Sequence, residues 1–506
     1  MITFFIGLAI LVFGGFLYCK LNTKLFRPSK QETPAIAKND GLDYVPMGKW
    51  KNSLVHLLNI AGTGPILGPI QGILFGPIAF LTIPIGCVLG GALHDYWCGM
   101  ISIRGGGIQM PEMVRKFLGK IVSKVYLVFM ILLMLLVGVV FIQTPGDIFV
   151  GQVLKGDTAP TNWVVWAVYG FIFLYYLLAT CLPIDKIIGK IYPIFGIILL
   201  ISAVGIFFGM FFKGYQLNEV WQTGVLGVHP NNALKFIPVF FVTVACGIVS
   251  GFHSSQATII SRTTKTEKEG STIFFGMMVV EGFIAMCWAA ATMGIHNLFP
   301  ETVSLDATSM VGEVSRNLLG NIGGIFAILG VIVLPISSGD TALRAIRLML
   351  GESFRMDQKK LKNRLFLSIG IFIVAFGILL WAKLSSDGFN VLWRYFAFAN
   401  QAIAVFTFAI ITVYMIRKTK PYLMALVPGS FYMFVVSSFI LNAKIGFNLS
   451  WTISYIIAGV LTAMFIAAVI WRGKRQLRLE GRIIDSIEEQ ELYDKHAAAQ
   501  KEQATV

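Results

Sequence analysis

Two polar interruptions stand inside long apolar segments of this sequence. The first is Asn59-Ile-Ala-Gly-Thr-Gly-Pro65, and the second lies within the apolar stretch 242–262. The second interruption comprises Gly247, Gly251, His253, Ser254, Ser255 and Gln256. In hydrocarbon every backbone N–H and C=O needs an internal partner, so a membrane helix is broken only where the freed groups line a cavity or bind something. The sequence therefore predicts two broken helices at a binding site.

A broken helix offers two kinds of binding group at the same depth in the membrane. The amino end of the second half presents N–H groups and the positive end of the helix dipole, which suit a carboxylate. The carboxyl end of the first half presents carbonyls, which suit a cation. We expect the N–H groups around Gly64 to Ile66 and at Gly251 to Ser254 to bind an anionic group of a substrate. The predicted substrate-binding residues are Asn59, Thr63, Gly64, Gly251, His253, Ser254, Gln256, Asn400 and Gln401.

Packing offers an alternative interpretation for several of these residues. The glycines could only allow close approach of helices, as small residues do in membranes. Asn400 and Gln401 stand among phenylalanines. They could face the cavity or tie helices together by hydrogen bonds.

Ionisable side chains inside apolar segments are the other candidates for chemistry, because a charge at membrane depth is costly unless it is paired or functional. His253 could carry a proton, donate to a substrate carboxylate, or serve as a hydrogen-bonded packing residue. Further candidates are His56, His94, Asp95, Glu281 and Asp340. Asp340 and Arg344 are four positions apart, which also fits a salt bridge at a helix end.

The elements that position these residues are predicted to be membrane helices. The chain has 506 residues, of which 56% are hydrophobic and 13% charged, and this excludes an ordinary soluble domain. Apolar runs of about 17 to 25 residues mark candidate spanning helices. We place thirteen of them, near 2–19, 53–73, 76–101, 123–143, 162–182, 187–211, 236–260, 271–294, 322–343, 365–383, 392–415, 422–441 and 450–471.

The formal net charge of +15 comes mainly from loops on one predicted side of the membrane. If the amino terminus is outside, every inner loop is basic and the carboxyl terminus is cytoplasmic. These loops are 20–52, 102–122, 183–190, 261–270, 344–364, 416–421 and the tail from 472. An anionic lipid leaflet explains this pattern, so no nucleic-acid partner is expected. The first apolar run lacks the features of a cleaved signal peptide, and the six cysteines are expected to be buried thiols.

The helices from residue 53 onward divide into two sets of five, and each set begins with an interrupted helix. Because five is odd, the second set enters the membrane from the opposite side, which is the inverted repeat of secondary transporters. The expected organisation has five parts: an extra helix and loop at 1–52, repeats at 53–212 and 213–415, two further helices at 416–471, and a tail at 472–506.

Five stretches carry a family resemblance. They are HLLNIAGTGPILGPIQG (56–72), GALHDYWCGMISIRGGG (91–107), GIVSGFHSSQATIISRT (247–263), SGDTALRAIRLMLGE (338–352) and WRYFAFANQAIAVFTFAIITVYM (393–415). Together they resemble the carbon starvation protein A family, CstA. The resemblance implies a starvation-linked transporter of the bacterial inner membrane that takes up peptides or, in some members, pyruvate. It also implies a core similar to the five-plus-five fold of the leucine transporter.

The resemblance also implies a site for a coupling cation. In the leucine-transporter fold a cation lies between the first broken helix and hydroxyl groups on the eighth core helix. Carried onto this sequence, that position falls on the carbonyl of Ala61 and on Ser337 and Ser338. The full set of candidate coupling residues is Ala61, Ser337, Ser338, Asp340, His94 and Asp95. Oxygen ligands suit Na⁺, and a proton is the alternative.

We therefore predict an all-helical membrane protein that moves a small carboxylated solute by alternating access, driven by a proton or sodium gradient. Its partners are the solute, the coupling cation and the lipid bilayer, and no cofactor is expected. The alternative is a membrane sensor, although the tail after the last helix is short for a signalling domain. An enzyme using Ser254 and His253 is disfavoured, because neighbours in sequence seldom face each other on a helix.

Overall fold

The computed structural model describes residues 1–41, 43–181, 185–224, 229–354, 356 and 360–491. These residues form helices and no strand, because apolar segments in hydrocarbon satisfy their backbone within a helix. The helices of the first half are α1 Ile2–Ala9, η1 Ile10–Gly14, α2 Gly15–Phe26, α3 Pro34–Ala37, α4 Lys49–Ala61, α5 Gly64–Gly72, η2 Ile73–Phe75, α6 Ala79–Gly86, η3 Cys87–Ala92, α7 Leu93–Arg104, α8 Met110–Phe117, α9 Lys120–Ile148, η4 Phe149–Val153, α10 Trp163–Cys181 and α11 Asp185–Phe212.

The second half continues in the same manner. Its helices are α12 Val220–Thr223, η5 Phe236–Phe240, α13 Phe241–Thr243, α14 Gly251–Ile260, η6 Glu267–Glu269, η7 Ser271–Gly276, α15 Met277–Leu298, η8 Pro300–Ser304, α16 Ala307–Ser353, α17 Leu361–Leu384, α18 Gly388–Arg417, α19 Leu423–Asn442 and α20 Trp451–Glu480. Each of the thirteen predicted segments overlaps one or more of these helices.

By length and hydropathy, nine helices in the described part of the chain are able to cross a membrane, or ten if the bent pair α4–α5 counts as one span. Two shorter apolar helices cover Trp163–Ala179 and Gly196–Phe212. Helix α16 contains a turn at Gly320, whose φ of 71° favours glycine. The predicted segment 322–343 is therefore the part of α16 that follows this turn.

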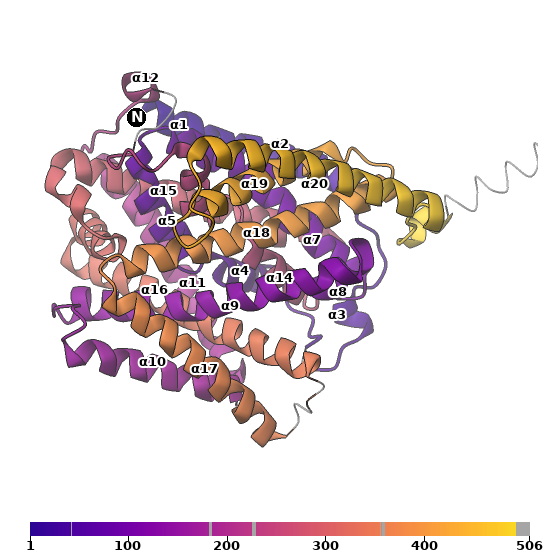
Figure 1. Ribbon diagram of the computed structural model, residues 1–506, viewed down its shortest axis with the longest axis horizontal. Coiled ribbons are helices and arrows are strands. Elements are labelled where there is room, and N and C mark those ends of the chain that lie inside the picture. Colours follow the sequence, from indigo (N-terminus) through magenta and orange to yellow (C-terminus); the bar gives the residue numbers. More distant parts are fainter. Residues whose placement is uncertain (42, 182–184, 225–228, 355, 357–359, 492–506) are drawn as a thin grey trace, which may run out of the picture.

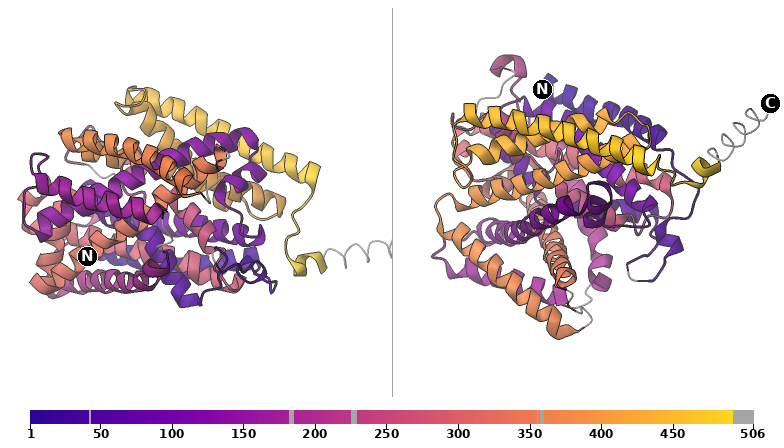
Figure 2. Two further views of the ribbon diagram at one scale, coloured as in Figure 1. Left: turned by 90° about the horizontal axis from the view of Figure 1, so that it is seen from below. Right: turned by 45° about the vertical axis from the view of Figure 1, so that its right-hand side comes forward.

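Helix α18 lies at the centre of the bundle and α20 on its outside. In Figure 1, α18 runs between α19 and α20 above it and α9 below it, and it contacts all three as well as α14. The apolar window of α18 is 94% buried, whereas that of α20 is 17% buried. In the left-hand view of Figure 2, α20 lies along the outer edge of the bundle. Because α18 is the buried helix and contacts α13 and α14, its amides lie next to the interrupted helix, whereas α20 lies on the outside.

The chain after α20 is bound to the end of the bundle that carries α7 and α18. Asp485 receives hydrogen bonds from Arg104 Nη1 at 2.8 Å, Lys418 Nζ at 2.6 Å and the Tyr414 hydroxyl at 2.7 Å. Arg104 also pairs with Glu267 at 3.1 Å. Helix α20 itself extends beyond the predicted boundary at 471, to Glu480. The segment 481–491 therefore packs against this face of the bundle.

The variant Asp485→Asn is expected to release segment 481–491. Burial alone would raise the pKa of Asp485, but Lys418 and Arg104 hold it below the usual range. A carboxyl with a lowered pKa keeps its stabilising effect above the usual range and loses it only as the pH falls through the lowered value. Proteolysis within 481–491 should therefore be slow in the wild-type protein at pH 5 and pH 7, and faster in the variant at both.

Glu480→Gln is the matched control for this prediction. Glu480 pairs with Arg417 at 2.7 Å, but its side chain is 55% exposed, and exposed ion pairs contribute little. Equal proteolysis of Asp485→Asn and wild-type protein would contradict the assigned role of Asp485.

Candidate functional site

The two interrupted helices meet at their breaks. Helices α4 and α5 are bent by 46° at Gly62 and Thr63. A Cβ atom built on Gly64 would lie only 2.1 Å from the Cβ of Cys246, and one on Gly68 would lie 3.0 Å from the carbonyl oxygen of Thr243. Glycine is thus required where the first break crosses the second. The packing role considered for Gly64 is observed in the structure.

The second break covers residues 244–250, so it contains Gly247 of the predicted interruption but not the polar residues that follow Gly251. Residues 244–250 are not helical, Gly247 has a φ of 90°, and Ser250 is extended before α14 begins at Gly251. His253, Ser254 and Gln256 therefore lie inside a regular helix, and the prediction that they form the break was wrong. The physical reason is that the first half already ends at Thr243, and the chain resumes helical geometry at Gly251, four residues after the left-handed backbone of Gly247.

The amino end of α14 is capped by the protein itself. The side-chain oxygen Asn400 Oδ1 accepts hydrogen bonds from Ser250 Oγ at 2.9 Å and from the backbone N–H of Phe252 at 3.1 Å. Gln401 Nε2 donates to the carbonyls of Phe241 and Val249, both at 3.1 Å. The two amides therefore tie α18 to both halves of the interrupted helix, and a substrate contact by either of them stays a prediction.

The other predicted substrate-binding residues lie on α4, at the bend between α4 and α5, and on α14. Thr63 is fully buried, and its hydroxyl has no hydrogen-bond partner in the described part of the chain. Asn59 is half-buried on α4. Ser254 Oγ bonds to the carbonyl of Gly251 at 2.6 Å, and Gln256 Nε2 bonds to Ser255 Oγ at 3.2 Å. Gly251 packs tightly, since a Cβ there would lie 2.4 Å from the Asn400 carbonyl oxygen.

A buried group of ionisable side chains lies beside the breaks. His253 Nδ1 is 3.2 Å from Asp95 Oδ2, and His253 Nε2 is 3.6 Å from Glu281 Oε2. Asp95 Oδ1 in turn is 2.8 Å from His94 Nδ1. These side chains are fully buried. The imidazole of His253 therefore stands between two carboxylates that come from α7 and α15.

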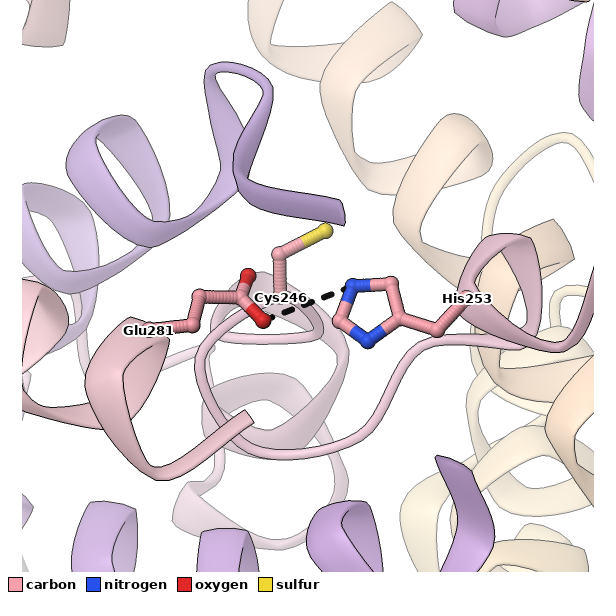
Figure 3. A group of neighbouring side chains, drawn as sticks. All are labelled: Cys246, His253 and Glu281. Carbon is pink, nitrogen blue, oxygen red and sulfur yellow. Dashed lines mark ion pairs between the residues drawn. The ribbon is translucent and has the colours of Figure 1, made fainter. Parts of the chain in front are cut away.

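Figure 3 shows that Cys246 points toward the same place as His253 and Glu281. The sequence names Glu281 as a membrane carboxylate but does not place it in the site, and it gives Cys246 no role. The sequence signal that could have placed Cys246 in the site was its position directly before Gly247 of the second interruption. His56 is also fully buried, and its ring packs edge-on against Phe274.

The predicted coupling residues are distributed over α4, α7 and α16. Ala61 is the last residue of α4, and Ser338 is 2% exposed, with no hydrogen-bond partner for its hydroxyl among the described residues. Asp340 accepts hydrogen bonds from Tyr175 and Thr341. The side chain of Ser337 lies outside the described residues. Helix α16 packs against both α4 and α5.

Another buried ion pair was not predicted. Lys383 Nζ lies 2.7 Å from Asp147 Oδ1, which also accepts a hydrogen bond from the hydroxyl of Tyr169. Sequence reasoning ended this helix at residue 143, but α9 continues to Ile148. Asp147 therefore lies within the bundle rather than in a loop.

The sequence of this chain matches a known protein family. The family model described as carbon starvation protein CstA matches residues 1–223, 147–317 and 300–439. The chain belongs to the carbon starvation protein CstA family. The resemblance inferred from the five sequence stretches is thereby confirmed.

Relatives within the CstA family are named as transporters. The peptide transporter CstA of Escherichia coli is 25% identical over 563 residues, covering 85% of this chain and 80% of that protein. The pyruvate/proton symporter BtsT of Escherichia coli is 26% identical over 316 residues, covering 50% of this chain and 43% of that protein. An uncharacterized membrane protein of Haemophilus influenzae is 40% identical over 339 residues, covering 58% and 91%.

A solved structure shows the same fold. The manganese transporter of Eremococcus coleocola aligns with a TM-score of 0.52 at 13% identity, covering 84% of this chain and 93% of that chain. This CstA-family chain is therefore an all-helical membrane transport protein and not an enzyme.

Proposed function

We propose that this protein is a secondary active transporter that takes up a small carboxylated solute, a peptide or pyruvate, across the bacterial inner membrane. The observation that carries the proposal is the contact between two interrupted helices, with Gly64 of one against Cys246 of the other. Two interrupted segments in corresponding halves of a membrane chain point to a transporter binding site. The names of the relatives in Escherichia coli support the two solute classes.

The proposed architecture has thirteen spans, with the amino terminus outside and the carboxyl terminus in the cytoplasm. Residues 53–212 and 213–415 form two inverted five-helix repeats that each begin with a broken helix. The basic loops support this orientation. Figure 1 supports it as well, because the amino terminus and the end of α20 lie at opposite ends of the bundle.

The solute is proposed to bind where the breaks cross, against the predicted set around Thr63, Gly64 and Gly251. The coupling cation is a proton or Na⁺. For Na⁺ the oxygens of Ala61, Ser337, Ser338 and Asp340 supply the ligands that a hard cation prefers, and His94 with Asp95 is the proposed position for a proton. The unpartnered hydroxyl of Ser338 supports a ligand at α16.

Uptake into proteoliposomes tests this proposal. Labelled pyruvate and a labelled dipeptide are offered separately, each with an imposed proton gradient, a sodium gradient, or neither. We expect one solute to accumulate above its equilibrium level under one gradient and under no other condition. Binding of a solute without accumulation under any gradient would instead support the sensor alternative.

A further inference from the structure

Three potential metal ligands converge on one buried point next to the second break (Figure 3). Cys246 comes from the non-helical segment 244–250, His253 from the first turn of α14, and Glu281 from α15. The thiol sulfur, an imidazole nitrogen and a carboxylate oxygen all lie within 4.8 Å of one another, and all three residues are buried. These residues are far apart in sequence, so the fold itself creates their proximity.

The orientation of the His253 ring is fixed by the carboxylate of Asp95 on the side away from Glu281. Its Nδ1 atom faces Asp95 at 3.2 Å, and Asp95 is held by His94 at 2.8 Å. His253 Nε2 is thereby aimed at Glu281. Neither that nitrogen nor either oxygen of Glu281 has a hydrogen-bond partner among the described residues. A metal-binding histidine usually donates its other ring N–H to a carboxylate. This hydrogen bond fixes the tautomer and makes the ligand nitrogen more basic.

We propose that Cys246, His253 and Glu281 bind a divalent transition-metal ion of borderline-soft character, such as Zn²⁺. A thiolate, an imidazole and a carboxylate are ligands that Zn²⁺ takes, whereas hard cations prefer a shell of oxygens. The buried carboxylates of Asp95 and Glu281 supply negative charge that a divalent cation balances.

The three ligand atoms are farther apart than in a loaded metal site, so they must move closer together when the metal binds. Bonds of about 2.0 to 2.3 Å in a tetrahedral site place ligand atoms about 3.5 Å apart, so the group contracts by about an ångström on binding. Segment 244–250 makes this movement feasible, because it carries Cys246 outside any helix.

Cobalt titration of the purified full-length protein in detergent tests the proposal, because a thiolate ligand gives Co²⁺ a charge-transfer band in the near ultraviolet. We expect one Co²⁺ per chain with this band. Cys246→Ser should remove the band and weaken Co²⁺ binding at least about 100-fold. The control Cys287→Ser removes another buried thiol of the neighbouring α15, and it should change neither quantity. Thermal unfolding of each variant shows whether it is folded.

Two further measurements keep the test independent of one variant. Asp95→Asn should weaken Co²⁺ binding about 10- to 100-fold while the thiolate band persists, because it removes only the support of the ring. X-ray absorption of the Zn²⁺-loaded wild-type protein should show one sulfur at about 2.3 Å with nitrogen and oxygen at about 2.0 to 2.2 Å. The proposal is overturned by a shell without sulfur, by absence of saturable Co²⁺ binding, or by a band that survives Cys246→Ser.

Discussion

Replacing Gly64 by leucine is expected to abolish solute uptake while the protein still reaches the membrane. The added Cβ would lie 2.1 Å from Cys246 Cβ and 2.3 Å from its sulfur, so the two breaks would be forced apart. Overpacking of this kind costs about 1 to 3 kcal/mol, which is enough to distort the crossing without unfolding a large bundle. Uptake per amount of reconstituted protein should fall more than about tenfold.

Gly251→Leu should have the same effect, since its Cβ would lie 2.4 Å from both the Asn400 carbonyl oxygen and Ile403 Cβ. Gly370→Leu in α17 is the matched control, because no atom lies within 4 Å of the position of its Cβ. The double variant Gly64→Ala with Cys246→Gly should recover uptake relative to Gly64→Ala alone, since it removes the clashing side chain. Wild-type uptake by both leucine variants would refute the assignment of the crossing as the solute site.

Replacing His253 by glutamine is expected to reduce both stability and coupled uptake. The imidazole lies 3.2 Å from the Asp95 carboxylate and 3.6 Å from that of Glu281, and all three side chains are fully buried. An amide cannot balance these carboxylates, and leaving a buried charge without its partner costs about 3 to 5 kcal/mol. Thermal unfolding in detergent should show the loss of stability, and uptake should fall more than about tenfold.

A neutralised triple variant separates structure from transport. Replacing Asp95 by Asn, His253 by Gln and Glu281 by Gln removes the charges together, so most of the lost stability should return. Uptake should stay low in this variant. Full uptake by the triple variant would show that the charged group serves packing alone. His296→Gln, at the far end of α15 and half-buried, should leave both quantities unchanged.

Much of the fold was predictable because hydrocarbon imposes a simple rule on the sequence. Apolar length gave the positions of the helices, and Gly62 with Pro65 marked the first break correctly. The second break was located only in part: Gly247 lies in it, but the backbone already departs from helix at Val244, and the polar residues from His253 to Gln256 lie in a helix. Polarity and helix breaking are separate properties, and only the conformation of glycine distinguishes them here.

The partners of the candidate residues were not predictable. His253 meets Asp95 from α7 and Glu281 from α15, and these contacts depend on how helices rotate and cross. Periodicity fixes which residues share a face of one helix, but it does not state which face meets which neighbour. The cap that Asn400 places on α14 was only one of two open alternatives for the same reason.

The four hydrogen bonds that Asn400 and Gln401 make to the interrupted helix set an energy scale for its movement. At about 1 kcal/mol each, breaking them all costs about 4 kcal/mol. Moving one elementary charge through about 100 mV releases about 2.3 kcal/mol. If two cations enter with the solute, as the proposed coupling allows, the voltage would supply about 4.6 kcal/mol, which is enough to break the hydrogen bonds between α14 and α18.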